Sequence, residues 1–155
     1  MIKLLDILEN KILVTRRSPE ERSKNYLIAI QKKIQQYIKD GSKGNLDLSN
    51  TPITSLPQGL KVGGNLGLSS TPITTLPQGL TVGGHLDLVR TLIISLPQDL
   101  TVGGYLYLMN TKITSLPQDL KVGGDLDLIN TPISKKYTKE QIKQMVPGIK
   151  GNIYI

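Results

Sequence analysis

The chain contains no cysteine, tryptophan or phenylalanine, and only one of its 155 residues is a histidine. Without cysteine, neither a disulfide framework nor a thiol nucleophile nor a thiolate zinc site can form. The single histidine, His85, has no glycine-framed serine motif to join it in a hydrolytic triad. We therefore expect a protein that is not an enzyme and that binds no metal or cofactor.

Long apolar runs are also missing. The opening stretch MIKLLDILENKILV is interrupted by Asp6, Glu9 and Asn10, so it does not read as a signal peptide. No run approaches the roughly 20 apolar residues that a membrane-spanning helix needs. These features predict a cytoplasmic protein without membrane contact, and the length favours one structural domain.

Net positive charge is confined to the two ends of the chain. Residues 1–43 carry ten Lys and Arg against five Asp and Glu, and residues 135–155 carry five against one. The middle, residues 44–134, carries four against six. Any electrostatic attraction to anions therefore concerns the ends. Candidate anion-binding residues are Arg16, Arg17, Lys32, Lys33, Lys135, Lys136, Lys139 and Lys143.

The middle of the chain repeats every 20 residues, with the pattern G-x-L-x-L-x-x-T-x-I-x-S-L-P-Q-x-L-x-V-G. A fixed period of this length predicts a solenoid, and L-x-L has the two-residue period of a strand with one buried face. The predicted inward residues are the leucine pairs 46/48, 66/68, 86/88, 106/108 and 126/128, isoleucines 53, 73, 93, 113 and 133, and leucines 56, 76, 96 and 116.

The return leg of each unit contains Leu-Pro-Gln, and twenty residues leave no room for a return helix. Proline there favours an extended or polyproline-like segment. The glycine pairs 63/64, 83/84, 103/104 and 123/124 are expected to supply positive φ angles at the entry to each strand.

This spacing resembles the leucine-rich repeat, and most closely the short bacterial type with "LP" on its convex side. That type is known from secreted effectors of enteric pathogens and from free-standing phage or bacterial repeat proteins. The resemblance covers about 90 of the 155 residues. It implies a parallel β-sheet on a concave face, and the phage likeness would place the protein in a host cytosol. Where the family usually has a buried Asn ladder between coils, this chain has Thr51, Thr71, Thr91, Thr111 and Thr131, so we expect a thinner ladder that is still satisfied.

Both ends of the repeat region need a cap, because a solenoid exposes the apolar ends of its stack. Ser18-Pro19-Glu20-Glu21 is a capping box that predicts a helix to about Gly41, with Leu27, Ile30, Ile34 and Ile38 on one face. A shorter helix around residues 3–13 would complete a helical hairpin. The predicted organisation is an N-terminal cap (1–43), repeats (44–134) and a C-terminal cap (135–155), whose helix from Thr138 to about Val146 precedes a last strand, GNIYI, at 151–155.

Variation between the copies concentrates in three outward columns of the predicted strands. The first column, before the first leucine, reads Asn45, Asn65, His85, Tyr105, Asp125 and Asn152. The second, between the leucines, reads Asp47, Gly67, Asp87, Tyr107, Asp127 and Tyr154. The third, after the second leucine, reads Ser49, Ser69, Val89, Met109 and Ile129, and beside it lie Asn50, Ser70, Arg90, Asn110 and Asn130.

Apolar and aromatic residues cluster on coils three to five, while coils one and two are small and polar. An apolar centre with Tyr, Met and Arg inside a polar rim has the composition of a protein interface. The predicted partner-binding residues are Tyr105, Tyr107, Met109, Val89, Ile129, Arg90, His85, Asp87, Asp125, Asp127 and Tyr154. The competing interpretation is that these are simply good strand residues; that explains single substitutions but not their clustering.

The leading hypothesis is a non-catalytic module, monomeric when unbound, that binds another protein on its concave face, possibly inhibiting a host factor. The alternative is a nucleic-acid or anionic-surface binder that uses the basic ends, although no aromatics interleave there to stack on bases. Catalysis ranks third, because the Asp125/Asp127 pair would lie on an open sheet with nothing to desolvate it.

Overall fold

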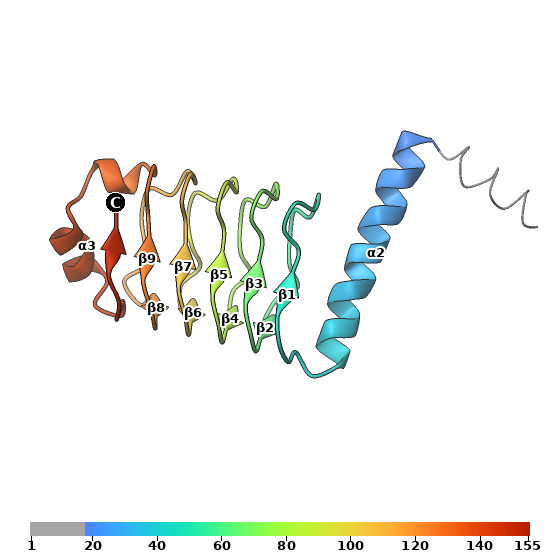
Figure 1. Ribbon diagram of the computed structural model, residues 1–155, viewed down its shortest axis with the longest axis horizontal. Coiled ribbons are helices and arrows are strands. Elements are labelled where there is room, and N and C mark those ends of the chain that lie inside the picture. Colours follow the sequence, from blue (N-terminus) through green and yellow to red (C-terminus); the bar gives the residue numbers. More distant parts are fainter. Residues whose placement is uncertain (1–17) are drawn as a thin grey trace, which may run out of the picture.

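The computed structural model describes residues 18–155, which form a parallel β-solenoid with a helix at each end (Figure 1). The coils stack side by side in a row, and each has the 20-residue length of the sequence repeat. Coil one begins at Gly44, and coils two to five begin at Gly64, Gly84, Gly104 and Gly124. The predicted fold class is confirmed.

The principal sheet contains six parallel strands in the order β1-β3-β5-β7-β9-β10. Its register pairs equivalent positions of successive coils, so that Leu46 lies beside Leu66 and Leu66 beside Leu86. Leucine therefore stacks on leucine inside the coil, and the outward columns stack in the same way on the other face. The strands are β1 (Leu46–Asp47), β3 (Leu66–Gly67), β5 (Leu86–Asp87), β7 (Leu106–Tyr107), β9 (Leu126–Asp127) and β10 (Ile153–Tyr154).

A second parallel sheet, absent from the sequence-based prediction, runs along the stack in the order β2-β4-β6-β8. Its strands are β2 (Lys61–Val62), β4 (Thr81–Val82), β6 (Thr101–Val102) and β8 (Lys121–Val122). The valines are buried and the other residue of each strand points outward. The return leg thus contributes both an extended segment and a hydrogen-bonded edge that ties the coils together.

The core is a continuous ladder of aliphatic side chains. Every predicted inward leucine and isoleucine of the repeats is buried except Leu116, which packs half-buried against the core. Leu60, Leu80, Leu100 and Leu120 complete it. Because each coil fills the same slots as its neighbours, the core is thin and regular, as a chain without large apolar aromatics requires.

We expected the threonine hydroxyls to bond between coils. Instead, the buried threonines bond within their own coil. The hydroxyl of Thr71 donates to the carbonyl of Leu68, and Thr91 donates to Leu88 in the same way. The prediction that the hydroxyls would be satisfied is confirmed, since no buried side-chain polar atom in residues 18–155 lacks a partner. The one hydroxyl hydrogen is used by the local bond, so Thr has no second donor with which to bridge coils as an amide NH2 would.

The glycine pairs serve close packing and not left-handed turns, so that prediction was wrong. Positive φ occurs instead after each strand, at Asn50, Ser70, Arg90, Asn110 and Asn130, with values of 57–59°. A Cβ on Gly63 would lie 2.9 Å from the Ser42 carbonyl oxygen, and the equivalent atoms on Gly83, Gly103 and Gly123 would lie closer still to the backbone of the preceding coil. Glycine is required there because backbones of successive coils touch.

The N-terminal helix α2 (Pro19–Lys39) begins at the predicted capping box, where Ser18 and Glu21 bond reciprocally. Only Ile30 and Ile34 of its expected apolar face are buried; Leu27 and Ile38 are about 40 % exposed. The face is narrower than predicted because α2 leans away from coil one toward its N-terminal end (Figure 1). The partner helix expected around residues 3–13 lies outside the described residues.

Tyr37 connects the C-terminal end of α2 to the stack. Its hydroxyl donates to the carbonyls of Ser42 and Gly44 and accepts from the Gly63 amide. This phenol therefore joins the helix, the connecting loop and the end of coil one, a role that the sequence pattern did not suggest.

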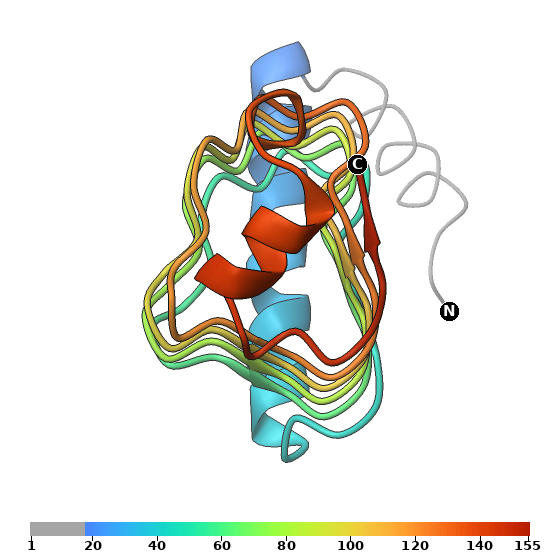
Figure 2. The ribbon, with the colours of Figure 1, turned by 90° about the vertical axis from the view of Figure 1, so that its left-hand side faces the viewer.

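The C-terminal cap follows the prediction closely. After a short 3-10 turn, η1 (Ile133–Lys135), the helix α3 (Lys139–Met145) begins at Thr138 with a capping box to Gln141. Seen end-on, α3 lies across the open end of the last coil, and α2 lies behind the opposite end (Figure 2). β10 then pairs with β9 in the predicted register, Ile153 beside Leu126.

Candidate functional site

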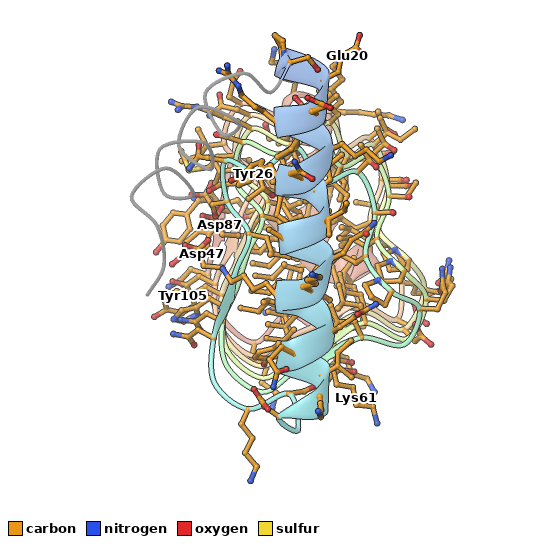
Figure 3. The ribbon with its side chains drawn as sticks, turned by 90° about the vertical axis from the view of Figure 1, so that its right-hand side faces the viewer. Glu20, Tyr26, Asp47, Lys61, Asp87 and Tyr105 are labelled. Carbon is orange, nitrogen blue, oxygen red and sulfur yellow. The ribbon has the colours of Figure 1, made fainter. Side chains whose placement is uncertain are left out.

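The outward side of the six-stranded sheet is called here the strand face, and it consists of the three variable columns with the adjoining left-handed residues. Asp47, Asp87 and Tyr105 all project from this side of the stack, whereas Lys61 lies on another side (Figure 3). Strands about 4.8 Å apart place each column in a continuous row. The predicted partner-binding residues therefore share one surface.

Three rings form a cluster in the middle of the strand face. His85 stacks on Tyr105 with ring centroids 4.7 Å apart and an interplanar angle of 23°. Tyr107 meets both rings edge-on, 6.2 Å from His85 and 6.1 Å from Tyr105. Tyr105 is 40 % exposed and Tyr107 is half-buried. The contacts among the three rings fix their orientations relative to one another.

Side chains of the first column connect one coil to the next. The Asn45 Oδ1 accepts the Asn65 amide, Asn65 Oδ1 accepts the His85 amide, and His85 Nδ1 accepts the Tyr105 amide, each at 2.8 Å. The same bond recurs from Asp125 to the Asn152 amide, also at 2.8 Å. The ladder that the family resemblance placed at the threonines thus runs on the strand face.

Aspartates of the second column close a short local bond instead. The Oδ1 atoms of Asp47, Asp87 and Asp127 accept the backbone N–H two residues ahead, at 2.9–3.0 Å. The Ser49 amide and hydroxyl lower the pKa of Asp47, and Lys33 contributes to the same shift. These aspartates are held in position by the bonds, so part of the predicted binding rim is also structural.

Coil four is the only one of the five coils that lacks both of these bonds within residues 18–155. Tyr105 replaces the acceptor of the first column, and Tyr107 replaces the acceptor of the second. Coil two keeps the first bond and has Gly67 in the second column. A hydrogen bond of this kind contributes about 0.5–1.5 kcal/mol. Coil four therefore carries two phenol rings in place of two hydrogen bonds that would stabilise the free protein.

Arg90 is a further departure from the repeat. At the left-handed position after the strand, other coils carry Asn or Ser, which tolerate positive φ, whereas Arg90 adopts a φ of 59°. An observed backbone outlier of this type is a reason to suspect a function for its side chain. Arg90 lies in coil three, the same coil as His85 of the ring cluster, beside Val89.

Burial of the Tyr107 phenol raises its pKa above the usual value, and Tyr105, Asp87, Asp125 and Asp127 raise it further. The phenol stays protonated at neutral pH and can donate a hydrogen bond. The carboxylates flank Tyr107 from both neighbouring strands, because Asp87 on β5 and Asp127 on β9 are its register partners.

The other predicted residues lie at the margins of the cluster. Val89 and Met109 are half-buried in the third column, and Ile129 is 40 % exposed. Tyr154 on β10 lies next to Asp127, and its hydroxyl is 3.4 Å from Asp125 Oδ2. The strand face therefore joins all of the predicted residues, but Tyr154 belongs to its far edge and not to the ring cluster.

Sequence reasoning missed a shallow hollow beside the ring cluster, about 350 Å³ in volume. It lies over Gly67, with Asp47 and Ser49 on one side and Asp87 on the other, and Tyr107 and His85 also line it. The signal was the alternation Asp47, Gly67, Asp87 in the second column, where glycine between two carboxylates leaves a gap.

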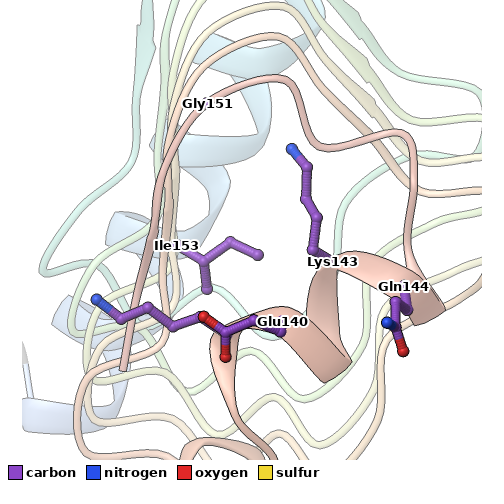
Figure 4. Close-up of a pocket in the computed structure, with 6 residues that line it drawn as sticks. Glu140, Lys143, Gln144, Gly151 and Ile153 are labelled. Carbon is purple, nitrogen blue, oxygen red and sulfur yellow. The ribbon is translucent and has the colours of Figure 1, made fainter.

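The basic end residues present a different surface. A hollow of about 450 Å³ between α3 and β10 is lined by Lys139, Glu140, Lys143, Gln144, Gly151 and Ile153 (Figure 4). Lys143 Nζ donates to the Ile149 carbonyl, and Lys139 lies 6.0 Å from the Tyr154 ring centroid. Lys136 lies over the Tyr137 ring. Arg16 and Arg17 lie outside the described residues.

Comparison with known proteins yields no match: no family model, curated protein or solved structure is significantly similar to the chain. Within residues 18–155, no group of three or more His, Cys, Asp or Glu side chains is placed to hold a metal ion. No helix of that same part of the chain is long and apolar enough to cross a membrane.

Proposed function

We propose that the protein is a non-catalytic binding module that recognises a partner protein through the strand face, with Tyr105 and Tyr107 at its centre. The observation that carries this proposal is coil four. It lacks two backbone-capping acceptors that its neighbours use, and presents two rings already oriented by His85. Tyrosine supplies large amphipathic contact area with little loss of conformational freedom, which suits the centre of an interface.

The arrangement around the rings supports the same function. Met109 and Val89 add apolar area beside the tyrosines, while Asp87, Asp125 and Asp127 form an acidic rim. Such a rim favours a basic partner and accelerates its association at low salt. The sequence resemblance to leucine-rich repeats of the short bacterial "LP" type adds support, because a solenoid sheet offers a rigid extended surface.

The alternative, binding of nucleic acid or anionic surfaces by the basic ends, has less support. Lys33 donates to the Asp47 carbonyl, and Lys143 is bonded to Ile149, so both are engaged within the protein. Phosphate binding weakens steeply between about 50 and 200 mM salt, whereas a mainly apolar interface does not. Salt dependence of partner binding separates the two functions.

A pull-down tests the proposal directly. The wild-type chain and a Tyr105→Ala/Tyr107→Ala variant are immobilised, and bound proteins from a candidate host extract are identified. Truncation of buried interface aromatics costs about 2 kcal/mol or more, roughly thirtyfold in affinity. Proteins captured by the wild type and lost in the double variant support the proposal.

A Ser69→Ala variant is the control, because it alters a small polar residue of coil two on the same face whose side chain bonds to no residue within 18–155. Equal capture by the double variant, or loss of capture only when Lys136 and Lys143 are changed, would move the binding surface to the basic ends.

A further inference from the structure

The hollow over Gly67 has a floor and two charged walls. Gly67 lies between Asp47 and Asp87 in the second column, and the parallel register places these neighbours directly beside it. The two aspartates are therefore about 9.6 Å apart across two strand spacings.

Gly67 lines the hollow without a side chain, and the Asp47 and Ser49 side chains of coil one lie close above it. A Cβ at that position would lie 2.7 Å from Asp47 Oδ1 and 2.8 Å from Ser49 Oγ, so any other residue would displace both side chains. Gly67 does not have a positive φ, and its backbone conformation does not demand glycine. The glycine is explained by the close approach of the Asp47 and Ser49 side chains above it.

The walls of the hollow are anionic and partly prearranged. Asp87 Oδ1 is held by the Val89 amide, while its second oxygen bonds to no residue within 18–155. Asp47 is held by Ser49 in the same way, with Lys33 nearby on α2 as the one positive group at that rim. Two fixed carboxylates facing one gap attract a cation.

The end of the hollow is aromatic. Tyr107 and His85 line it together, with ring centroids 6.2 Å apart. Guanidinium groups bond carboxylates in a bidentate manner, are weakly hydrated and stack on aromatic rings, whereas the compact ammonium of lysine does none of these as well. The combination of two carboxylates and aromatic rings around one hollow therefore matches arginine better than lysine.

We propose that the Gly67 hollow is a subsite for an arginine side chain of the partner protein, seated between Asp47 and Asp87 against Tyr107. This inference rests on the proposed protein-binding function, because it adds one named contact next to the ring cluster. It also predicts the polarity of the partner, which must present an arginine beside the apolar patch that covers Tyr105.

Binding of a small probe tests the subsite without the partner. Amide signals of the full ¹⁵N-labelled chain are followed by NMR while N-acetyl-arginine amide is added, with N-acetyl-citrulline amide as the uncharged probe of the same shape. The Gly67 and Asp87 amides should shift with the arginine probe and remain nearly still with the citrulline probe.

Asp87→Asn provides the decisive variant, because asparagine keeps an oxygen for the Val89 amide and loses only the charge. An exposed ion pair is worth up to about 1 kcal/mol, so the probe should bind about fivefold more weakly. Asp119→Asn, on the return leg, makes the same change in net charge and should leave the response unchanged.

Three results would overturn the subsite. They are no shift at Gly67, an equal response to the citrulline probe, or a stronger response to calcium chloride than to the arginine probe, which would assign the hollow to a metal ion. A silent Gly67 together with partner binding that still depends on the two tyrosines would refute the subsite and leave the proposed function standing.

Discussion

Replacing Tyr105 with asparagine should leave the free protein more stable than replacing it with alanine. Both substitutions remove the ring and its stacking on His85, so that loss cancels in the comparison. Only asparagine restores the acceptor that coils one and two place in this column. Gly124 leaves space for it, as Gly64 and Gly84 do beside Asn45 and Asn65.

The expected difference follows from the ladder itself. The equivalent bonds are 2.8 Å long at four places along the stack, and the Asp125 residue that would donate is half-buried. One such bond contributes about 0.5–1.5 kcal/mol to the free energy of unfolding. With a urea m-value of about 2 kcal/mol per molar, the midpoint of the asparagine variant should lie roughly 0.5 M above that of alanine.

The assay is urea unfolding followed by circular dichroism, with Asn152→Ala as the matched control. Asn152 occupies the same column, but its side chain bonds to no residue within 18–155, so alanine there should shift the midpoint very little. If the two Tyr105 variants unfold at the same urea concentration, Tyr105 does not interrupt the ladder. The claim that coil four sacrifices stability would then be refuted.

Three further outcomes follow from the stack. Leu106→Ala, which truncates a fully buried side chain, should cost about 2–5 kcal/mol in urea melts, whereas Tyr107→Ala should cost less than about 1 kcal/mol; equal losses would place Tyr107 in the core. Deleting residues 151–155 removes β10 and uncovers β9, so size-exclusion chromatography should detect association, and an unchanged monomer with an unchanged melting midpoint would contradict this. Gly83→Ala should prevent cooperative folding, because its Cβ would overlap the Gly63 carbonyl; a protein that melts like the wild type would show that the coils can separate.

The buried half of the structure could be predicted because it repeats. Leu46, Leu66 and Leu86 fill the same slot in successive coils, and the two-residue alternation fixes which way they point. The capping boxes at Ser18 and Thr138 could be recognised in the sequence because their bonds join residues only three apart. Local spacing and fixed period carried this information.

The second sheet could not be predicted in the same way. Its strands are two residues long, and Lys61-Val62 or Thr101-Val102 alone has no alternation to detect. The bonds that define it join residues 20 apart, as between Lys61 and Thr81. Only the register of the stacked coils makes those pairs neighbours.

The hydrogen bonds of the first outward column could not be predicted either, because they also join residues 20 or more apart in the sequence. The residue types nevertheless contained a clue to them. Asn45, Asn65, His85 and Asp125 differ in size and charge, yet all can accept a hydrogen bond, and Tyr105 is the exception. From the sequence, the outward columns were interpreted only as a partner-binding surface. The shared acceptor chemistry shows that this column is constrained in coils one, two, three and five.

That exception ties the tyrosines to the hollow. The three hydrogen bonds accepted by Asn45, Asn65 and His85 join coils one to four, and they run beside the Asp47 and Asp87 walls of the hollow. His85 belongs both to this ladder and to the ring cluster, so the bonded part of the strand face carries the charged hollow and leads directly into the aromatic contact. A partner that seats an arginine over Gly67 would meet Tyr107 at once, because the same ring lines the hollow and joins the cluster with His85. Loss of the Tyr107 ring should therefore weaken both contacts, whereas loss of Tyr105 should weaken only the apolar one.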